Sequence, residues 1–194
     1  MIQFARLSFT LLLLVPFALP THAEEPTGSE STPDDGIVVS DGRIRLKPAE
    51  GWVRSKPRTR IVEHEFVASL EDGDQDDARI TVMGAGGSVE QNIDRWISQF
   101  SQPGGKSTRG STTLKEREIA GQKVHTVDIA GTYRDQLGPF APATDRENYR
   151  MLGAIIVTEK MGRYYLKMVG PKKTVDANEQ AFAKVIESLS VKGP

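Results

Sequence analysis

The chain has 194 residues, a length that indicates one domain rather than two. It contains no cysteine, which excludes disulfides, a thiol nucleophile, thiolate metal sites and lipid attachment at a cysteine. Its 25 basic and 26 acidic residues give a formal net charge of −1, so we expect no nucleic-acid partner, which would require clustered basic residues.

The first 23 residues have the pattern of a secretory signal peptide. Arg6 supplies a positive charge, residues 7–19 are almost entirely apolar, and residues 21–23 (THA) offer small side chains at a cleavage site. The alternative is an uncleaved membrane anchor, but the apolar run is shorter than the about 20 residues that a spanning helix needs, and prolines interrupt it. We therefore expect cleavage after Ala23, a periplasmic or secreted protein, and no membrane span in the mature chain.

Residues 24–36 (EEPTGSESTPDDG) should form a disordered linker. The segment carries five acidic residues, no basic residue and almost no apolar side chain. It cannot bury enough surface to offset the loss of chain entropy. The alternative is an acidic interaction arm. Residues 37–194 then form a single α+β domain.

The domain begins with a predicted hairpin over residues 37–47. Asp41 and Gly42 favour a type I′ turn, in which both central residues have positive φ. Ile44 and Leu46 alternate with basic residues, which indicates one buried face. Pro48 ends the strand, and a turn that carries Trp52 follows. Strands are predicted next over 60–69 and 78–84, joined by an acidic turn.

A helix is predicted from Ser88, after the glycine cluster of residues 84–87. Ser88 and Gln91 match a capping box, in which each side chain accepts a hydrogen bond from the other residue's backbone N–H. The apolar positions lie on one helical face. They are Val89, Ile93, Trp96, Ile97 and Phe100. We expect the Trp96 face to close one side of the core, and residues 103–105 (PGG) to stop the helix.

The second half of the chain is predicted to be mainly β. Strands are expected at 111–119, 122–134, 150–160 and 163–170, with a long loop at 135–149. The strand at 150–160 is apolar on both faces, which is typical of a central strand covered on both sides. A last helix is expected at 174–189, with Phe182 facing inward. The result is a mainly antiparallel sheet of about six to eight strands flanked by two helices, an α/β/α sandwich.

Residues 44–52 (IRLKPAEGW) resemble the opening of the PsbP/Mog1-like α/β/α sandwich family. There an amphipathic strand leads into a proline and a Gly-Trp turn, here Pro48, Gly51 and Trp52. The order of elements that follows is similar to that family up to the last helix. The resemblance implies a binding or accessory domain, and it carries over no catalytic residue.

Two loop motifs do not support a ligand. The glycine cluster lacks the third glycine of a dinucleotide-binding loop, since Val89 stands there, and it lacks the lysine of a Walker A loop. Asp72, Asp74 and Asp76 alternate as in a calcium loop, but Asp77 and Met83 occupy the positions of the required glycine and glutamate. A turn into a capped helix and an acidic hairpin turn are the simpler interpretations.

After signal cleavage the only histidines are His64 and His125. Each shares a strand face with apolar residues, and both are interpreted as hydrogen-bonded and facing the core. The alternative is a hydrolase or metal-dependent enzyme that uses one of them. No nucleophile elbow or H-E-x-x-H motif is present, so an enzyme is the less favoured interpretation, and no metal or cofactor is predicted.

The loop at 135–149 is the candidate binding region, because long irregular loops inside a domain are often functional. Arginines and aromatic residues, which anchor partners, gather at its ends and centre. They are Arg134, Phe140, Arg146, Tyr149 and Arg150. The sequence therefore predicts an exported, non-enzymatic domain that binds an envelope or secreted protein, or a small ligand, through this loop. The predicted structural residues are Trp52, Ser88, Trp96 and Phe182.

Overall fold

The computed structural model describes residues 36–69, 77–84, 86–136, 138 and 141–192. The predicted signal peptide, nearly all of the linker, Phe140 and most of the acidic turn at 70–77 lie outside these residues. Among the described residues, no helix has both the length and the apolar character needed to cross a bilayer.

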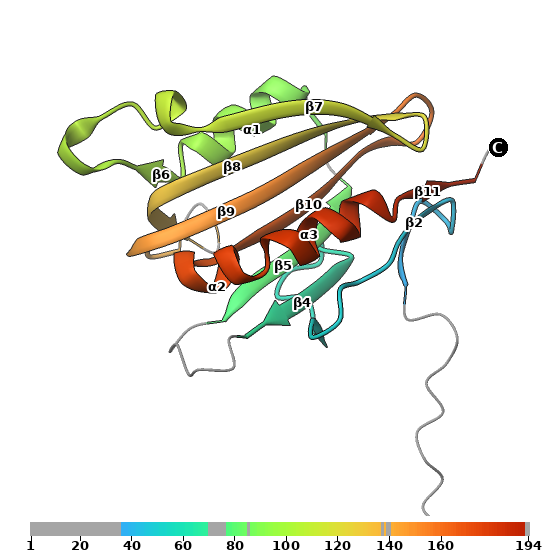
Figure 1. Ribbon diagram of the computed structural model, residues 1–194, viewed down its shortest axis with the longest axis horizontal. Helices are drawn as coiled ribbons and strands as arrows, with labels where there is room; N and C mark the ends of the chain where they lie inside the picture. The colour runs from blue at the N-terminus through green and yellow to red at the C-terminus, as the bar shows by residue number, and fades with distance from the viewer. Residues whose placement is uncertain (1–35, 70–76, 85, 137, 139–140, 193–194) are drawn as a thin grey trace, which may run out of the picture. The chain divides into compact units, whose positions relative to one another are not determined.

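The main feature is an antiparallel sheet of eight strands (Figure 1). Their order is β3-β4-β5-β10-β9-β8, and β6 and β7 both pair with β8. The bounds are β3 Val53–Ser55, β4 His64–Ala68, β5 Ala78–Gly84, β6 Phe100–Ser101, β7 Thr113–Ile119, β8 Gln122–Asp135, β9 Thr144–Thr158 and β10 Gly162–Pro171. This confirms the predicted fold class.

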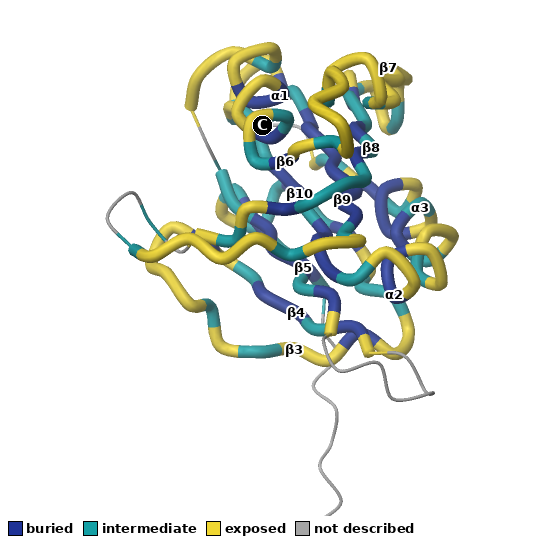
Figure 2. Tube along the Cα trace, turned by 90° about the vertical axis from the view of Figure 1, so that its left-hand side faces the viewer, coloured by how far each residue is buried: buried dark blue, intermediate teal, exposed yellow. Residues whose placement is uncertain are grey.

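The central strand β9 is covered on both faces, as its double apolar pattern predicted. Leu152 and Ile156 belong to one core cluster, and Met151 and Ile155 belong to the other. Buried positions follow the central strands, with helices on either side (Figure 2). The first cluster lies under α2 (Lys172–Ala177) and α3 (Glu179–Glu187), and the second lies under α1 (Val89–Ile97).

The N-terminal hairpin forms as predicted. β1 (Ile37–Val39) pairs with β2 (Ile44–Leu46), and Asp41 and Gly42 have φ of 52° and 83°, the positive values that a type I′ turn requires. The hairpin does not join the main sheet. It pairs with a short C-terminal strand, β11 (Ser190–Val191), in a separate three-stranded sheet that the sequence analysis did not predict.

Helix α1 begins as predicted and ends earlier. The Gln91 backbone N–H donates to Ser88 Oγ at 3.1 Å, and the Ser88 backbone N–H donates to Gln91 Oε1 at 2.9 Å, which completes the capping box. The helix stops at Ile97, three residues before Phe100. Phe100 stays buried because its backbone pairs with Tyr133 of β8, so the core contact is made from a strand and not from the helix.

The predicted C-terminal helix is divided into α2 and α3 at Asn178, whose φ of −96° and ψ of 1° are not helical. The side chain of Asn178 donates to the Thr174 carbonyl at 2.9 Å and accepts from Trp52 Nε1 at 3.2 Å. Trp52 is buried against Phe66, and Phe182 of α3 is buried in the same cluster. Asn178, at the break between the two helices, therefore connects the helical layer to the turn after β2.

The prediction of a loop at 135–149 is wrong for most of these residues. β8 continues to Asp135 and β9 begins at Thr144, with Asp135 paired to Thr144 across a long hairpin. A register shift between Gly131 and Tyr133 bends the hairpin. The side chains there are largely polar and exposed, so no apolar alternation was present to reveal the strands.

Candidate functional site

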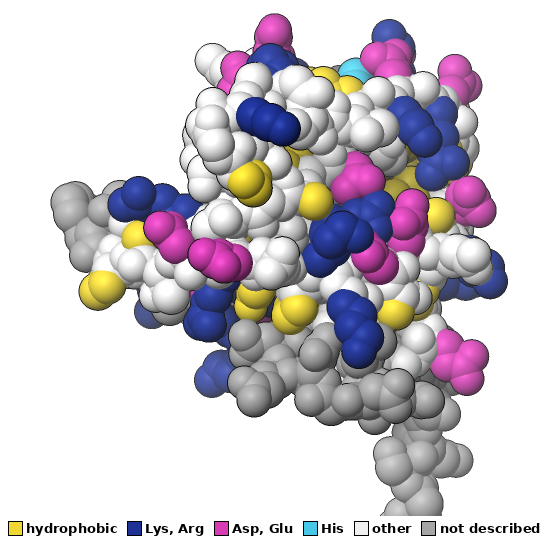
Figure 3. All heavy atoms as spheres, turned by 60° about the vertical axis from the view of Figure 1, so that its left-hand side comes forward, with side chains coloured by type: hydrophobic (Ala, Val, Ile, Leu, Met, Phe, Trp, Pro, Cys, Tyr) yellow, Lys and Arg dark blue, Asp and Glu magenta, His cyan; other side chains and the backbone are white. Residues whose placement is uncertain are grey.

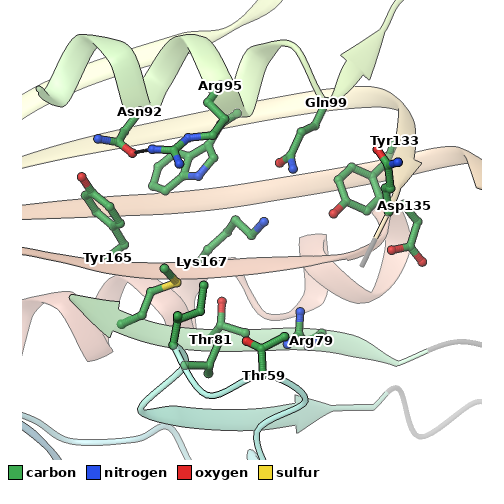
Figure 4. Close-up of a pocket in the computed structure, with 15 residues that line it drawn as sticks. Thr59, Arg79, Thr81, Asn92, Arg95, Gln99, Tyr133, Asp135, Tyr165 and Lys167 are labelled. Carbon is green, nitrogen blue, oxygen red and sulfur yellow. Dashed lines mark hydrogen bonds between the residues drawn. The ribbon is translucent and has the colours of Figure 1, made fainter. Parts of the chain in front are cut away.

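A cavity of about 240 Å³ opens on the sheet face that α1 covers (Figure 4). Its walls come from β5, β10, the end of β8, helix α1 and the segment before β4. Polar and apolar side chains share the lining. They are Thr59, Ile61, Val62, Arg79, Thr81, Met83, Asn92, Arg95, Trp96, Gln99, Tyr133, Asp135, Gln136, Tyr165 and Lys167.

Lys167 lies at the centre of this cavity because of the alternation along β10. Tyr165 and Val169 belong to the core cluster under α1, whereas Leu166 and Met168 belong to the opposite cluster. Lys167 shares the face of Tyr165 and Val169, so its side chain enters the space under the helix. In Figure 4 its ammonium points into the space bounded by Gln99 and Tyr133. No hydrogen bond or ion pair joins this ammonium to any residue that the structure describes.

The cavity is electropositive around this lysine. Burial lowers the pKa of Lys167 to about 8, Arg79 and Arg95 add to this effect by repulsion, and Asp135 opposes it. With that pKa, the amine remains mostly protonated at neutral pH. Burial also raises the pKa of Tyr133 and of Tyr165, so both phenols stay neutral. The cavity thus presents a charged donor beside neutral aromatic walls.

Arg79, by contrast, is neutralised by a buried carboxylate on the neighbouring strand. Its Nε and Nη2 donate to Glu65 Oε1 and Oε2, both at 2.8 Å, and the Arg58 backbone N–H donates to Glu65 Oε2 at 3.0 Å. The hydrogen bond from Arg79 lowers the pKa of Glu65 although burial opposes it. Arg79 therefore contributes less positive charge to a ligand than its position suggests.

Helix α1 forms the roof of the cavity. Trp96 packs on Gly153 of β9 and lies edge-on to Tyr165, with ring centroids 5.7 Å apart. Asn92 is buried and donates to the Gly86 and Ser88 carbonyls at 3.0 and 2.8 Å, and its amide oxygen accepts from Arg95. Just after the helix, the buried amide oxygen of Gln99 has no hydrogen-bond partner among the described residues.

The residues predicted to bind a partner are divided between two regions. Arg134 is exposed on the hairpin, Arg146 is 3.9 Å from Asp135 in an ion pair, and Tyr149 stacks on Tyr133 with centroids 6.0 Å apart. These three lie at the end of the sheet where Tyr133 and Asp135 line the cavity. Arg150 lies on the opposite sheet face, since its register partner Ala130 alternates with Ile129 of the core under α1.

Arg150 is the centre of an ionic cluster that connects the sheet to α2 and α3. It donates to both carboxylate oxygens of Asp128 at 2.9 and 2.7 Å, to Asp176 at 2.7 Å and to Glu179 at 2.8 Å. These hydrogen bonds, that of Asp128 first, raise the pKa of Arg150. On the face shown in Figure 3, basic and acidic side chains are interspersed in the same way. Arg150 therefore contributes to the internal structure, since its hydrogen bonds hold α2 and α3 to the sheet.

Replacing Arg150 with methionine should reduce the free energy of unfolding by about 2–3 kcal/mol, because three carboxylates would lose their shared cation. Urea unfolding near neutral pH measures this loss. Arg117→Met is the matched control, since its contact with Glu187 of 3.4 Å also connects the sheet to α3 but is exposed, and it should change stability by less than about 0.5 kcal/mol. Equal losses for the two variants would contradict a structural role for the cluster.

The two histidines do not share a site. His64 aligns across the sheet with Val82, Leu166, Ala154 and Thr126, one residue out of register with His125, so the two face opposite sides of the sheet. His64 contacts the Val38 carbonyl and Arg54, each at 2.8 Å, and His125 is 3.4 Å from Glu116. Within the described ranges, no group of three His, Asp or Glu side chains could hold a metal ion.

Sequence reasoning did not identify Lys167 or Gln99. The sequence did contain one indication. Lys167 lies between Tyr165 and Val169 on the same strand face, a position where a buried apolar side chain is expected and a lysine is unusual. No sequence pattern predicts that β5, β10, α1 and the end of β8 surround this lysine, because that prediction requires knowledge of the strand order.

No protein-family model matches the chain, and no curated protein matches its sequence. Several solved structures are similar to it, among them the following two. One is LpqN of Mycobacterium tuberculosis, described as involved in cell envelope biogenesis, with a TM-score of 0.50, 8% identity, and coverage of 81% of this chain and 90% of that chain. The other is the cyanobacterial PsbP (CyanoP) of Synechocystis sp. PCC 6803, with a TM-score of 0.49, 12% identity, and coverage of 81% and 91%. The fold of this chain is therefore similar to that of LpqN.

Proposed function

We propose that the protein is a non-enzymatic binding domain of the cell envelope, and that the cavity beneath α1 holds the group it recognises. One observation carries the proposal: a central strand places a lysine in a cavity where no described carboxylate pairs with it. A desolvated cation without a partner costs folding free energy. Proteins retain such a cost mainly where it supports function.

The hairpin that replaces the predicted loop contributes to the same site. Asp135 and Gln136 line the cavity at the open end of β8, and Tyr149 stacks on the lining residue Tyr133. A partner that inserts a group into the cavity would also meet Arg146, the register partner of Tyr133, whereas Arg134 alternates to the opposite face of the hairpin. The binding region proposed from the sequence as a loop thus becomes the end of a hairpin together with the adjacent cavity.

Three observations support the envelope as the compartment. The N-terminal 23 residues have the composition of a signal peptide, and no cysteine requires a reducing environment. LpqN, whose fold is similar, is described as involved in cell envelope biogenesis.

A binding role is favoured over catalysis because the two histidines contact separate structural partners on opposite faces of the sheet.

The test is to isolate the mature protein from its own envelope fraction and to compare native and denatured masses for copurifying molecules. Thr81 is buried in the cavity wall, so Thr81→Met should fill the space and release the bound molecule. Thr126→Met is the control, because Thr126 is half-buried on the other sheet face. Equal retention by the two variants, or a wild-type protein that carries nothing, would reject the proposal.

A further inference from the structure

We infer that the ligand of this cavity is a small organic monocarboxylate with an apolar or aromatic body, and that the Lys167 ammonium pairs with its carboxylate. The inference rests on the proposed function, since it assigns a chemical class to the same site. Three features of the cavity lead to it: its charge, its size and walls, and the unpaired polar atom of Gln99.

The charge of the lining favours one negative group. Of its basic side chains, Arg79 is paired with Glu65, and Arg95 donates to the amide of Asn92 and not to a carboxylate. Lys167 remains as the cation that points into the space without a partner among the described residues. Lys167, Arg79 and Arg95 are opposed by Asp135 and by the Glu65 carboxylate on Arg79, which leaves a net charge of +1. One carboxylate balances that charge, whereas a dianion such as a phosphate monoester exceeds it.

The same charges disfavour amines. An ammonium group on the ligand would be repelled by the unpaired Lys167 ammonium, with Arg95 nearby. A neutral apolar molecule could fill the space, but it would leave the Lys167 ammonium desolvated and unpaired. A carboxylate removes that penalty and forms a charge-assisted hydrogen bond.

The size and walls favour a flat or branched apolar body. A volume of about 240 Å³ is slightly below the range of about 300–1,000 Å³ that is typical of pockets for drug-sized ligands, so a smaller molecule fits it. Trp96, Tyr165 and Tyr133 supply aromatic surface, and Met83 and Val62 supply aliphatic surface. Exposed Ile61 extends the apolar surface to the rim. Such walls bind an aromatic or aliphatic group, while one charged residue determines its orientation.

The amide of Gln99 adds a second polar requirement in the same space. Its oxygen is buried and has no described partner, which costs free energy unless a donor reaches it. Figure 4 shows Gln99 and Lys167 directed toward the same space. A hydroxyl on the apolar body could donate to this oxygen while the carboxylate accepts from Lys167, so hydroxylated acids should bind better than unsubstituted ones.

The test uses amide chemical shifts of the mature protein titrated with benzoate, phenylacetate, 4-hydroxybenzoate, the matching amides benzamide and phenylacetamide, and phenyl phosphate. Carboxylates should shift residues that line the cavity, with dissociation constants on the order of 1 mM for probes of this size. The neutral amides and phenyl phosphate should bind at least about tenfold more weakly. Lys167→Met should remove the preference for carboxylates, whereas Lys115→Met, an exposed lysine on β7, should retain it.

A pH series provides a second readout that needs no variant. Carboxylate binding to the wild-type protein should weaken as pH rises through the titration of Lys167, while binding of the amides should not change. Equal binding of acids and amides in the cavity would overturn the carboxylate inference and leave the binding cavity standing. Tighter binding of phenyl phosphate would also overturn it. If no probe shifted the cavity residues at about 10 mM, both the inference and the proposed site would fail.

Discussion

Replacing Lys167 with methionine is expected to stabilise the fold by about 2 kcal/mol near neutral pH. The lysine side chain is partly buried, and its pKa falls from 10.5 to about 8 mainly through burial. Each pKa unit corresponds to about 1.4 kcal/mol, so the charged form costs at most roughly 3 kcal/mol, and partial access to water reduces that cost. Methionine keeps the length and apolar stem of the side chain and removes the charge.

Urea unfolding of the two proteins measures the gain, and the pH dependence identifies its cause. Because the folded-state pKa of Lys167 is below the unfolded-state value, the unfolded chain binds more protons between these values. The stability of the wild-type protein relative to Lys167→Met should therefore rise from about pH 8 to about pH 10.5, and the advantage of the variant should vanish there. A variant less stable than wild type at neutral pH would mean that the lysine supports the fold.

Gly153→Ala is expected to destabilise the protein by about 3 kcal/mol. An added Cβ would lie 2.5 Å from Trp96 Cζ3 and 3.0 Å from Cε3, so the indole or the central strand would have to move. Trp96 holds α1 on the sheet and lines the cavity, so displacement of its ring should also weaken ligand binding. Thermal unfolding and the carboxylate titration measure the two effects.

Two further variants show whether the indole is the cause. Gly86→Ala is the control, since a Cβ there meets nothing within 4 Å and should have a small effect on stability. Trp96→Leu should be destabilising alone, but adding Gly153→Ala to it should cost much less than in the wild-type background. If the losses of stability from Gly153→Ala and Trp96→Leu are additive, the contact with the indole is not the reason that position 153 requires glycine.

Local patterns predicted those elements whose stabilising contacts are close in sequence. Ser88 and Gln91 are three residues apart, and the capping box forms as their spacing predicted. Asp41 and Gly42 form their turn because both residues tolerate the positive φ that it requires. The double apolar pattern of β9 predicted a central strand because burial on both faces requires it.

Predictions failed where long-range pairing outweighs local preference. Phe100 fits the helical face of α1 in sequence, but its backbone pairs with β8 and the helix ends at Ile97. The polar hairpin at 135–149 forms strands because β8 and β9 are already paired, and the ladder continues beyond the apolar residues. Nor did the sequence indicate the carboxylates that Arg150 contacts, because they lie 22–29 positions away.

The sequence by itself determined the order of most strands and helices, the faces that they bury and the resemblance of the fold, because period and capping are short-range properties. Only the tertiary structure decided which side chains meet. Lys167, Gln99, Trp96 and Arg79 surround one cavity because β5 pairs with β10 and α1 crosses the same face. The glycine cluster before α1 carries no ligand motif, but it leads into the helix whose Trp96 and Arg95 form the roof of that cavity. Strand order and helix placement are properties of the whole chain, and they bring together residues whose spacing in sequence has no pattern.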